Sequence, residues 1–275
     1  MRFITFEALD GTRINSKDFG LFVSKFRPSP PSLRNTFDDL NGRHGQIDFG
    51  ASYDNREIEF EGFFNGKTSE AYPMYRDRVF RNFARLKSFY LIDSAQPWKR
   101  WLVRLDGDWD VDKVNLSTFG EVKATFITTG KPFAETNATT LQPKIWNDNA
   151  WWWGSGISWG DDDAYIYNST SFTVRNFGDV PVDPRQSELV IKFTGASSNL
   201  TITNTTTGDV FQYNGTTGAS DTIEINGIRS LKNGLSIISS TNLKLITIEQ
   251  GDNEFTVAGA TGAFTVSFEF RYLYL

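Results

Sequence analysis

The feature that most constrains the fold of this chain is a series of short segments in residues 171–275 in which apolar and polar side chains alternate. Stretches such as ELVIKFTG, LTITNTT and DTIEING are separated by dipeptides typical of turns, including Asn214-Gly215, Asn226-Gly227 and Asn233-Gly234. Successive side chains of a strand point to opposite faces, and Asn-Gly favours the positive φ angles of tight hairpins. Many short strands joined by such turns predict a β-sandwich.

The first half of the chain has a different pattern. The segment REIEFEGFF at residues 56–64 alternates glutamates with apolar residues and predicts a strand. Residues 72–88 predict a helix, because their apolar residues recur at helical spacing. These residues are Tyr72, Tyr75, Val79, Phe83 and Leu86. Strand-like segments follow, so this half predicts an α+β domain with one helix on a β-sheet, and the chain as a whole is expected to be mainly β.

Two polar stretches are predicted to lack regular structure. Residues 29–56 have the composition of a loop, with Pro30-Pro31 and the turn signal Asn41-Gly42. Residues 130–145 are polar and contain two prolines, which is typical of a domain boundary. The expected domains are therefore residues 1–135 and residues 136–275.

Charge is distributed unevenly between the two halves. Residues 1–140 contain 20 Lys and Arg against 19 Asp and Glu, whereas residues 141–275 contain 8 against 14. A nucleic-acid-binding protein is expected to concentrate positive charge on one face, so this balance argues against that class. It also indicates that the two halves have different roles.

Tryptophan is concentrated at the predicted boundary, where five of the eight residues of this type lie between positions 146 and 159. Three of them are consecutive, so in a strand they would point to both faces. We expect some of these rings to fill the sandwich or the seam between the domains. Others are candidates for a partner interface or a weak sugar-stacking surface: Trp151, Trp152, Trp153 and Trp159.

Residues suited to catalysis or metal binding are scarce. The chain has no cysteine, which excludes disulfides, thiolate nucleophiles and Cys-ligated metals. Its one histidine, His44, is not accompanied by a G-x-S-x-G motif and cannot form a multi-His metal site. Asp161-Asp162-Asp163 lacks EF-hand spacing and is predicted to be a solvated turn. We therefore predict no catalytic residues, no metal site and no cofactor, and we expect no enzyme.

The order of these segments resembles the distal tail protein (Dit) family of siphophages, long-tailed phages with non-contractile tails. Three stretches carry the resemblance. The first is NGRHGQIDFGASYDNREIEFEGFF, a glycine-rich segment that leads into an Arg-led alternating strand. The second is the predicted helix with the segments after it, as far as ATFITTGKPFAE. The third is IEQGDNEFTVAGATGAFTVSFEFRYLYL, with a Gly-Asp-Asn turn and an aromatic final strand.

The resemblance implies a structural role at the phage tail tip or baseplate. Residues 1–135 would be the ring-forming belt domain, and the ring, usually a hexamer, would join the tail tube to the tip. Residues 136–275 would be a galectin-like β-sandwich that docks other tail proteins. The implied partners are further copies of the chain, the tail tube protein, the tape-measure protein, a tail-associated lysin or tip protein, and receptor-binding or other baseplate proteins. The chain would be made in the host bacterial cytoplasm or encoded by a prophage.

The same resemblance implies a lumen through which tape-measure protein and DNA pass without specific binding. Negative charge on its wall would avoid trapping DNA. Asp38, Asp39 and Asp48 are candidates for an acidic loop that faces this lumen.

A carbohydrate-binding β-sandwich that contributes to host cell-wall adhesion is the alternative function. Residues 160–275 contain neither His nor Trp, so the tryptophan-rich segment would have to supply the stacking surface. The N-terminal segment MRFITFEALDGTR does not have the pattern of a signal peptide, and no apolar run reaches 18 residues. Membrane insertion is therefore not expected.

Overall fold

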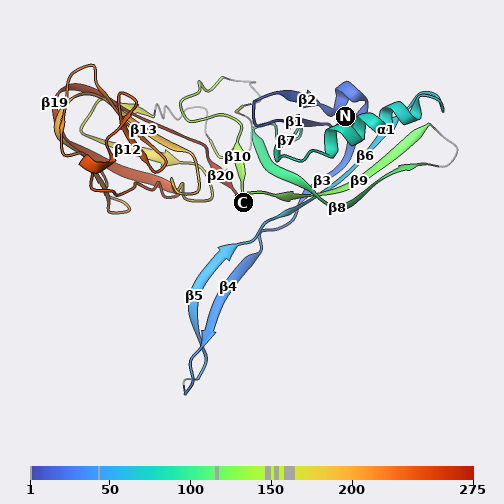
Figure 1. Ribbon diagram of the computed structural model, residues 1–275, viewed down its shortest axis with the longest axis horizontal. Helices are drawn as coiled ribbons and strands as arrows, with labels where there is room; N and C mark the ends of the chain where they lie inside the picture. Colours follow the sequence, from blue (N-terminus) through green and yellow to red (C-terminus); the bar gives the residue numbers. More distant parts are fainter. Residues whose placement is uncertain (1, 43, 115–117, 146–149, 152–154, 158–164) are drawn as a thin grey trace. The chain divides into compact units, whose positions relative to one another are not determined.

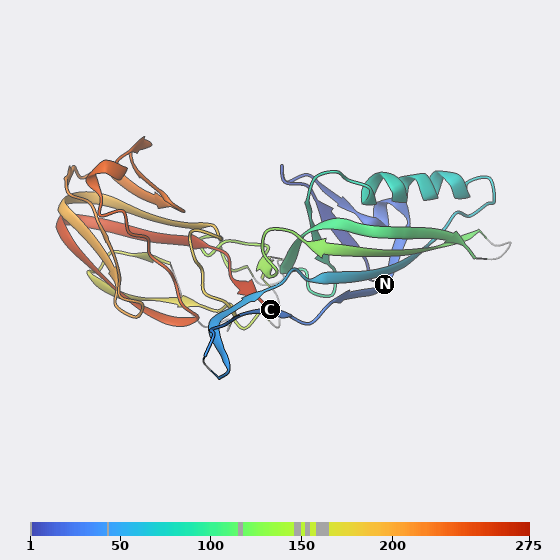
Figure 2. The same cartoon turned by 60° about the horizontal axis from the view of Figure 1, so that its bottom comes forward.

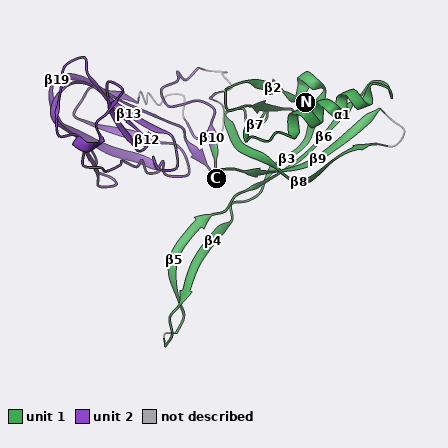
Figure 3. Ribbon diagram, in the orientation of Figure 1, with its two compact units in different colours: residues 1–134, 275 green, residues 135–274 purple. Residues whose placement is uncertain are grey.

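The structure, a computed structural model, describes residues 2–42, 44–114, 118–145, 150–151, 155–157 and 165–275. The chain forms two compact units, one of residues 1–134 with Leu275 and one of residues 135–274 (Figures 1 and 3). Strands predominate in both units, which confirms the mainly β class. Among the described residues, none of the helices is long and apolar enough to span a membrane.

Unit 1 is built on an antiparallel sheet with the strand order β2-β1-β7-β8-β9-β6-β3. The short 3-10 helix η1 (Ser16–Phe19) precedes the last strand of this order. The strands are β1 (Ile4–Glu7), β2 (Arg13–Asn15), β3 (Leu21–Pro28), β6 (Glu57–Asn65), β7 (Phe89–Asp93), β8 (Lys99–Lys113) and β9 (Phe119–Thr128).

Helix α1 (Tyr72–Phe83) covers one face of this sheet (Figure 2). Phe83 lies at the centre of the core, with its ring centroid 5.2 Å from Phe60, 5.3 Å from Phe6 and 5.5 Å from Phe126. All four rings are buried, and aromatic rings at such distances stabilise a core beyond the area that they bury.

The predicted helix is correct in position but too long at its C-terminal end. Tyr72, Val79 and Phe83 of the predicted stripe are buried. The helix ends at Phe83, because Ala84 leaves the helical conformation with ψ 55° and the Arg85 amide bonds to the Phe83 carbonyl in a tight turn. Leu86 therefore lies beyond the helix and is 94% exposed.

Residues 29–56 do not form the predicted loop. They contain a two-stranded antiparallel hairpin, β4 (Leu33–Asp39) and β5 (Gln46–Tyr53), which continues the chain between β3 and β6 (Figure 1). Every residue of the two strands is exposed except Ile47, which is half-buried. Without a core face, the hairpin shows no clean alternation of polar and apolar residues, so its sequence resembles that of a loop.

Unit 2 is organised around two long antiparallel strands, β13 (Leu189–Asn204) and β19 (Gly251–Phe270). The sheet has the order β11-β19-β13-β16-β17-β18, and three further strands pair with β13 or β19. Figure 2 shows the strands of this unit in two facing layers. The remaining elements of the chain are β10 (Ala134–Thr136), β11 (Ile166–Tyr167), β12 (Ser171–Asn176), β14 (Asp209–Gln212), β15 (Thr216–Thr217), β16 (Thr222–Asn226), β17 (Arg229–Lys232), β18 (Leu235–Ser236), η2 (Ile238–Ser240) and β20 (Leu273–Tyr274). Of these, β10 and β20 pair with each other and are not part of the unit 2 sheet.

The core of unit 2 is aromatic and aliphatic and follows the period of the strands. Phe193 on β13 and Phe255 and Phe268 on β19 are fully buried. Phe255 and Phe268 pack edge to face with centroids 4.8 Å apart. Asn253 is also fully buried; its side-chain N–H donates to the Glu249 carbonyl, and its side-chain oxygen accepts from the Asn204 amide. These contacts give the Gly-Asp-Asn segment a structural role, because a buried amide needs partners.

Candidate functional site

The face of the unit 1 sheet opposite α1 carries many charged side chains. The alternation of β6 points Ile58 and Phe60 into the core and leaves Glu57, Glu59 and Glu61 on the open face. Cross-strand neighbours on β3, β8 and β9 extend this face. On these four strands, the paired residues that share the open face include seven carboxylates and four cations: Glu57, Glu59, Glu61, Asp106, Asp110, Asp112 and Glu121, with Lys25, Arg27, Arg104 and Lys123.

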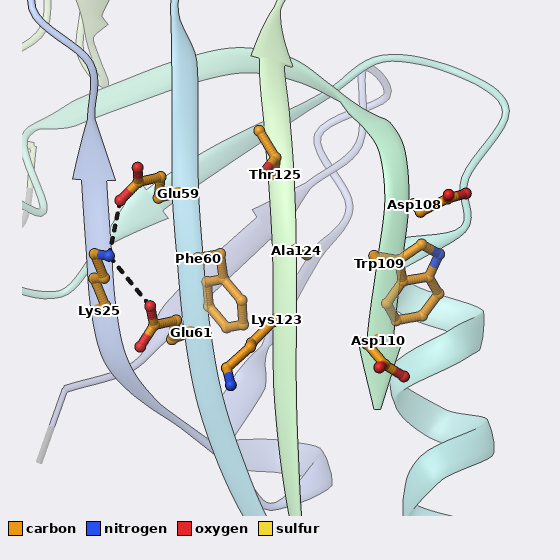
Figure 4. A pocket seen from close by; sticks show the side chains of 10 residues that line it. All are labelled: Lys25, Glu59, Phe60, Glu61, Asp108, Trp109, Asp110, Lys123, Ala124 and Thr125. Carbon is orange, nitrogen blue, oxygen red and sulfur yellow. Dashed lines mark hydrogen bonds and ion pairs between the residues drawn. The ribbon is translucent and has the colours of Figure 1, made fainter. Parts of the chain in front are cut away.

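One row of this face alternates in charge across four strands. Lys25 lies opposite Glu61, Glu61 opposite Lys123, and Lys123 opposite Asp110. The Lys25 ammonium lies 2.8 Å from Glu59 and 3.2 Å from Glu61, and Figure 4 shows it between the two carboxylates. Opposite charges in cross-strand pairs favour this register.

The ion pairs of Lys25 favour the charged forms of Lys25 and Glu59. The hydrogen bonds to Glu59 and then Glu61 raise the pKa of Lys25, and the hydrogen bond from Lys25 lowers the pKa of Glu59. The groups are exposed, so the pairs contribute little to folding stability. With seven carboxylates and four cations, the face carries net negative charge.

A shallow depression of about 710 Å³ lies on this face (Figure 4). Four carboxylates from β6 and β8 border it, and Lys25 and Lys123 supply the positive charge. Among the described residues, no group of three or more His, Cys, Asp or Glu side chains could hold a metal ion. The depression is therefore suited to contact with a polar surface rather than to the enclosure of a small molecule.

The three aspartates predicted to face a lumen all lie on the exposed hairpin. Asp38 and Asp39 belong to β4 and Asp48 to β5, so they are on strands and not in a loop. Asp39 pairs with Gln46, and Phe37 pairs with Asp48, which places Asp39 and Asp48 on one face of the ribbon. Asp38 pairs with Ile47 and occupies the other face. The hairpin thus does not gather the three carboxylates on one surface.

Large apolar side chains are exposed along the same hairpin. Their exposed fractions lie between 39% and 64%. They are Leu33, Phe37, Leu40, Phe49 and Tyr53. An isolated two-stranded hairpin is marginally stable in water, and exposed apolar patches of this kind mark interaction sites.

Sequence reasoning noted the glutamates of β6 but missed the acidic face. The sequence pattern that indicates the acidic face is a second alternating run of carboxylates in the segment DGDWDVD: Asp106, Asp108, Asp110 and Asp112. The pairing of β8 with β9 and of β9 with β6 brings the two acidic runs onto one face. Strand order is a tertiary property that the local pattern of either run does not specify.

The tryptophan candidates are only partly described. Trp151 is buried, with its ring centroid 6.1 Å from Tyr272, and its indole N–H has no acceptor among the described residues. A buried ring cannot stack on a sugar, so Trp151 is a poor candidate for that role. Trp152, Trp153 and Trp159 lie outside the described residues, as does Asp161-Asp162-Asp163.

Two family models match the chain. Residues 13–128 match the phage tail protein RIFT-related domain, and residues 178–272 match the siphovirus-type tail component, C-terminal domain. The two matches together cover most of unit 1 and most of unit 2. A search of curated proteins gives no match.

Solved structures with a similar fold come from phage tails. The crystal structure of the Dit protein of phage SPP1, described as a paradigm of the hub of the adsorption apparatus in phages that infect Gram-positive bacteria, has a TM-score of 0.68 at 15% identity. The similarity covers 98% of this chain and 99% of that chain. A chain of the phage p2 baseplate in its activated conformation with Sr has a TM-score of 0.45 at 12% identity, with 98% of both chains covered.

Proposed function

Because this chain belongs to the siphovirus-type family of distal tail proteins, we propose that it forms a ring that joins the tail tube of a siphophage to its tail tip or baseplate. In this proposal the ring is a hexamer and the chain is a structural hub, not an enzyme. The similarity of fold to SPP1 Dit over nearly the whole chain supports the role.

The observation that carries the proposal is the exposed hairpin β4–β5. None of its described residues is buried, yet it displays five large apolar side chains. Among the described strands, β2 at one end of the unit 1 sheet pairs only with β1, whereas β3 at the other end is partly covered by Arg2, which bonds to the Val23 amide and the Phe26 carbonyl. Unpaired edges and exposed hairpins are stabilised when a neighbouring subunit covers them, and rotational symmetry repeats that contact until a ring closes.

The acidic sheet face of unit 1 supports a conduit through such a ring. Its excess of carboxylates would repel the phosphates of DNA, so that DNA passes without being trapped. Asp38, Asp39 and Asp48 on the hairpin remain candidates for the lumen wall, and Glu57, Glu59 and Asp110 join them. Tape-measure protein would occupy the same conduit before DNA.

The remaining partners follow from the position between tube and tip. They are the tail tube protein, a tail-associated lysin or tip protein, and receptor-binding or other baseplate proteins. We propose that residues 136–275, as a galectin-like sandwich, dock the latter group. The protein would be made in the cytoplasm of the host bacterium and would reside at the tail tip of the virion.

Immunogold labelling of intact virions with an antibody against the purified chain tests this role. We expect label at the distal end of the tail, at the junction of tube and tip. Label on the capsid or along the whole tail tube, or virions without label after the tip has been opened by mild denaturant, would contradict the proposal.

A further inference from the structure

An exposed aliphatic segment on unit 2 pairs through its backbone but buries none of its side chains fully. Residues 231–245 contain six Leu and Ile residues, and none of the fifteen positions is buried. Leu and Ile are among the residues most often fully buried, so this segment departs from the usual pattern. Leu235, Ile238 and Leu243 of this segment have exposed fractions between 47% and 75%, and so has Ile228, which precedes the segment.

The segment is held in place and is not a loose loop. The Ile237 amide bonds to the Ser230 carbonyl at 2.9 Å, and the Asn214 amide bonds to the Ser240 carbonyl at 2.7 Å. The side-chain amide of Asn242 bonds to the Val210 carbonyl at 2.7 Å. These hydrogen bonds hold the backbone of the segment in place, while Leu235, Ile238 and Leu243 stay exposed to water.

Leu243 is held in an unfavourable conformation. Its φ is 58°, in the left-handed region that leucine rarely adopts, and its side chain is 71% exposed. Neither the backbone angle nor the exposure stabilises the isolated chain. Strained residues of this kind cluster at binding sites, where a partner recovers the cost.

The charges beside the apolar side chains indicate the chemistry of the partner. The second half of the chain, residues 141–275, has eight Lys and Arg residues and 14 acidic residues. Residues 228–245 contain three of these cations and none of these acidic residues. Lys232 pairs with Asp221 at 3.1 Å. Arg229 and Lys244 are exposed and make no ion pair among the described residues. The apolar segment is thus flanked by two free cations in an otherwise acidic half of the chain.

We propose that residues 228–245 are a docking surface for a different tail protein, which presents apolar side chains next to Asp or Glu. Two copies of this segment facing each other would oppose cation to cation, so charge disfavours a symmetric self-contact. The identification of the partner as a tail protein rests on the proposed hub role. The surface itself rests on exposure, backbone strain and charge.

Photo-cross-linking in assembled tails tests the proposal. A photoreactive residue replaces Leu235 in the full chain, and Ser171, an exposed residue of β12 on another part of the sheet, serves as the control position. We expect position 235 to cross-link to one other tail protein, through a peptide that contains Asp or Glu, and position 171 to give no such product.

Two variants separate docking from folding. Leu243→Gly keeps the left-handed backbone and removes the side chain, so we expect an unchanged or higher Tm together with loss of the cross-link. Lys244→Glu should also abolish the cross-link, whereas Lys192→Glu, at an exposed position on β13, should not. If position 235 cross-links to another copy of this chain, or gives no cross-link in tails that contain the chain, the proposed docking surface is wrong while the hub role can still hold. Tails without the chain would overturn the hub role as well.

Discussion

Glu7 of β1 is one of the buried charged residues of unit 1. Its carboxylate accepts from Arg100 at 2.9 Å and from Arg13 at 2.7 Å, and both Glu7 and Arg100 are less than 10% exposed. The Arg100 guanidinium also lies over the Tyr90 ring, 3.9 Å from its centroid. A buried ion pair of this kind is costly to break, because the remaining charge keeps its desolvation cost without its partner.

Glu7→Ala should therefore lower the free energy of unfolding by about 3 kcal/mol. Asp54→Ala, which breaks the exposed ion pair with Arg34, is the matched control and should change it by less than about 1 kcal/mol. Chemical denaturation of the full chain, followed by fluorescence, measures both. Equal losses for the two variants would contradict this account of the buried pair.

Asp221 should make the stability of unit 2 dependent on pH in the acid range. Hydrogen bonds from the Gly218 amide, the Asn233 side chain and Lys232 lower its pKa from 3.8 to about 2. A carboxylate with a depressed pKa stabilises the fold above its unfolded pKa, and the contribution is lost as pH falls through the folded value. The difference in Tm between the wild type and Asp221→Asn should be constant near neutral pH and shrink between pH 3.8 and about 2. A difference that is as large at pH 2 as at pH 7 would contradict the prediction.

At the scale of elements, strands and helices that pack on a core could be predicted from the sequence. Residues 56–64 alternate strictly because one face of β6 is buried, and the stripe of α1 is readable for the same reason. The hairpin β4–β5 has no buried face, so its pattern carried no signal and residues 29–56 were predicted to be a loop. The end of α1 was missed because Leu86 continues the apolar spacing after the backbone has left the helix.

The pairing of β6 with β9 depends on a glycine. Gly120 lies opposite Phe64, and a Cβ at this position would lie 2.3 Å from the Phe64 ring. Phe64 is fully buried, so its ring has little room to move.

We expect Gly120→Ala to lower the free energy of unfolding by about 1–3 kcal/mol through overpacking. Gly262→Ala is the matched control, because an added Cβ there meets only the Ala196 side chain at 4.0 Å. Thermal unfolding of the two variants compares the effects. A harmless Gly120→Ala would mean that Phe64 can move away from the new methyl group.

At the scale of the whole molecule, the mainly β class and the family could be predicted because they depend on the order of many segments. The candidate site could be predicted less well. The acidic sheet face combines residues from strands that become neighbours only through tertiary pairing, as Lys25, Glu61 and Asp110 do. In the proposed ring, the exposed hairpin would contact other copies of the chain. The sequence pattern of one chain reflects mainly the residues that this chain buries within itself, so it gives little information about such a contact.

Removal of the hairpin should separate folding from assembly. Replacing residues 31–54 by a short turn removes no buried side chain among the described residues, although it breaks the ring contact of Tyr53 with the half-buried Phe133. We expect the Tm of the dissociated chain to change by less than about 4 °C, which corresponds to roughly 1 kcal/mol. The same variant should fail to form rings in size-exclusion chromatography with light scattering. Ring formation without the hairpin would show that other surfaces are sufficient for assembly.

The most direct test of the proposed hub is the mass and shape of the purified full-length chain in solution. Light scattering combined with electron microscopy should show a closed ring of identical copies with a central hole, in agreement with a hexamer. A chain that stays monomeric at high concentration and hydrolyses a cell-wall polymer would contradict the account.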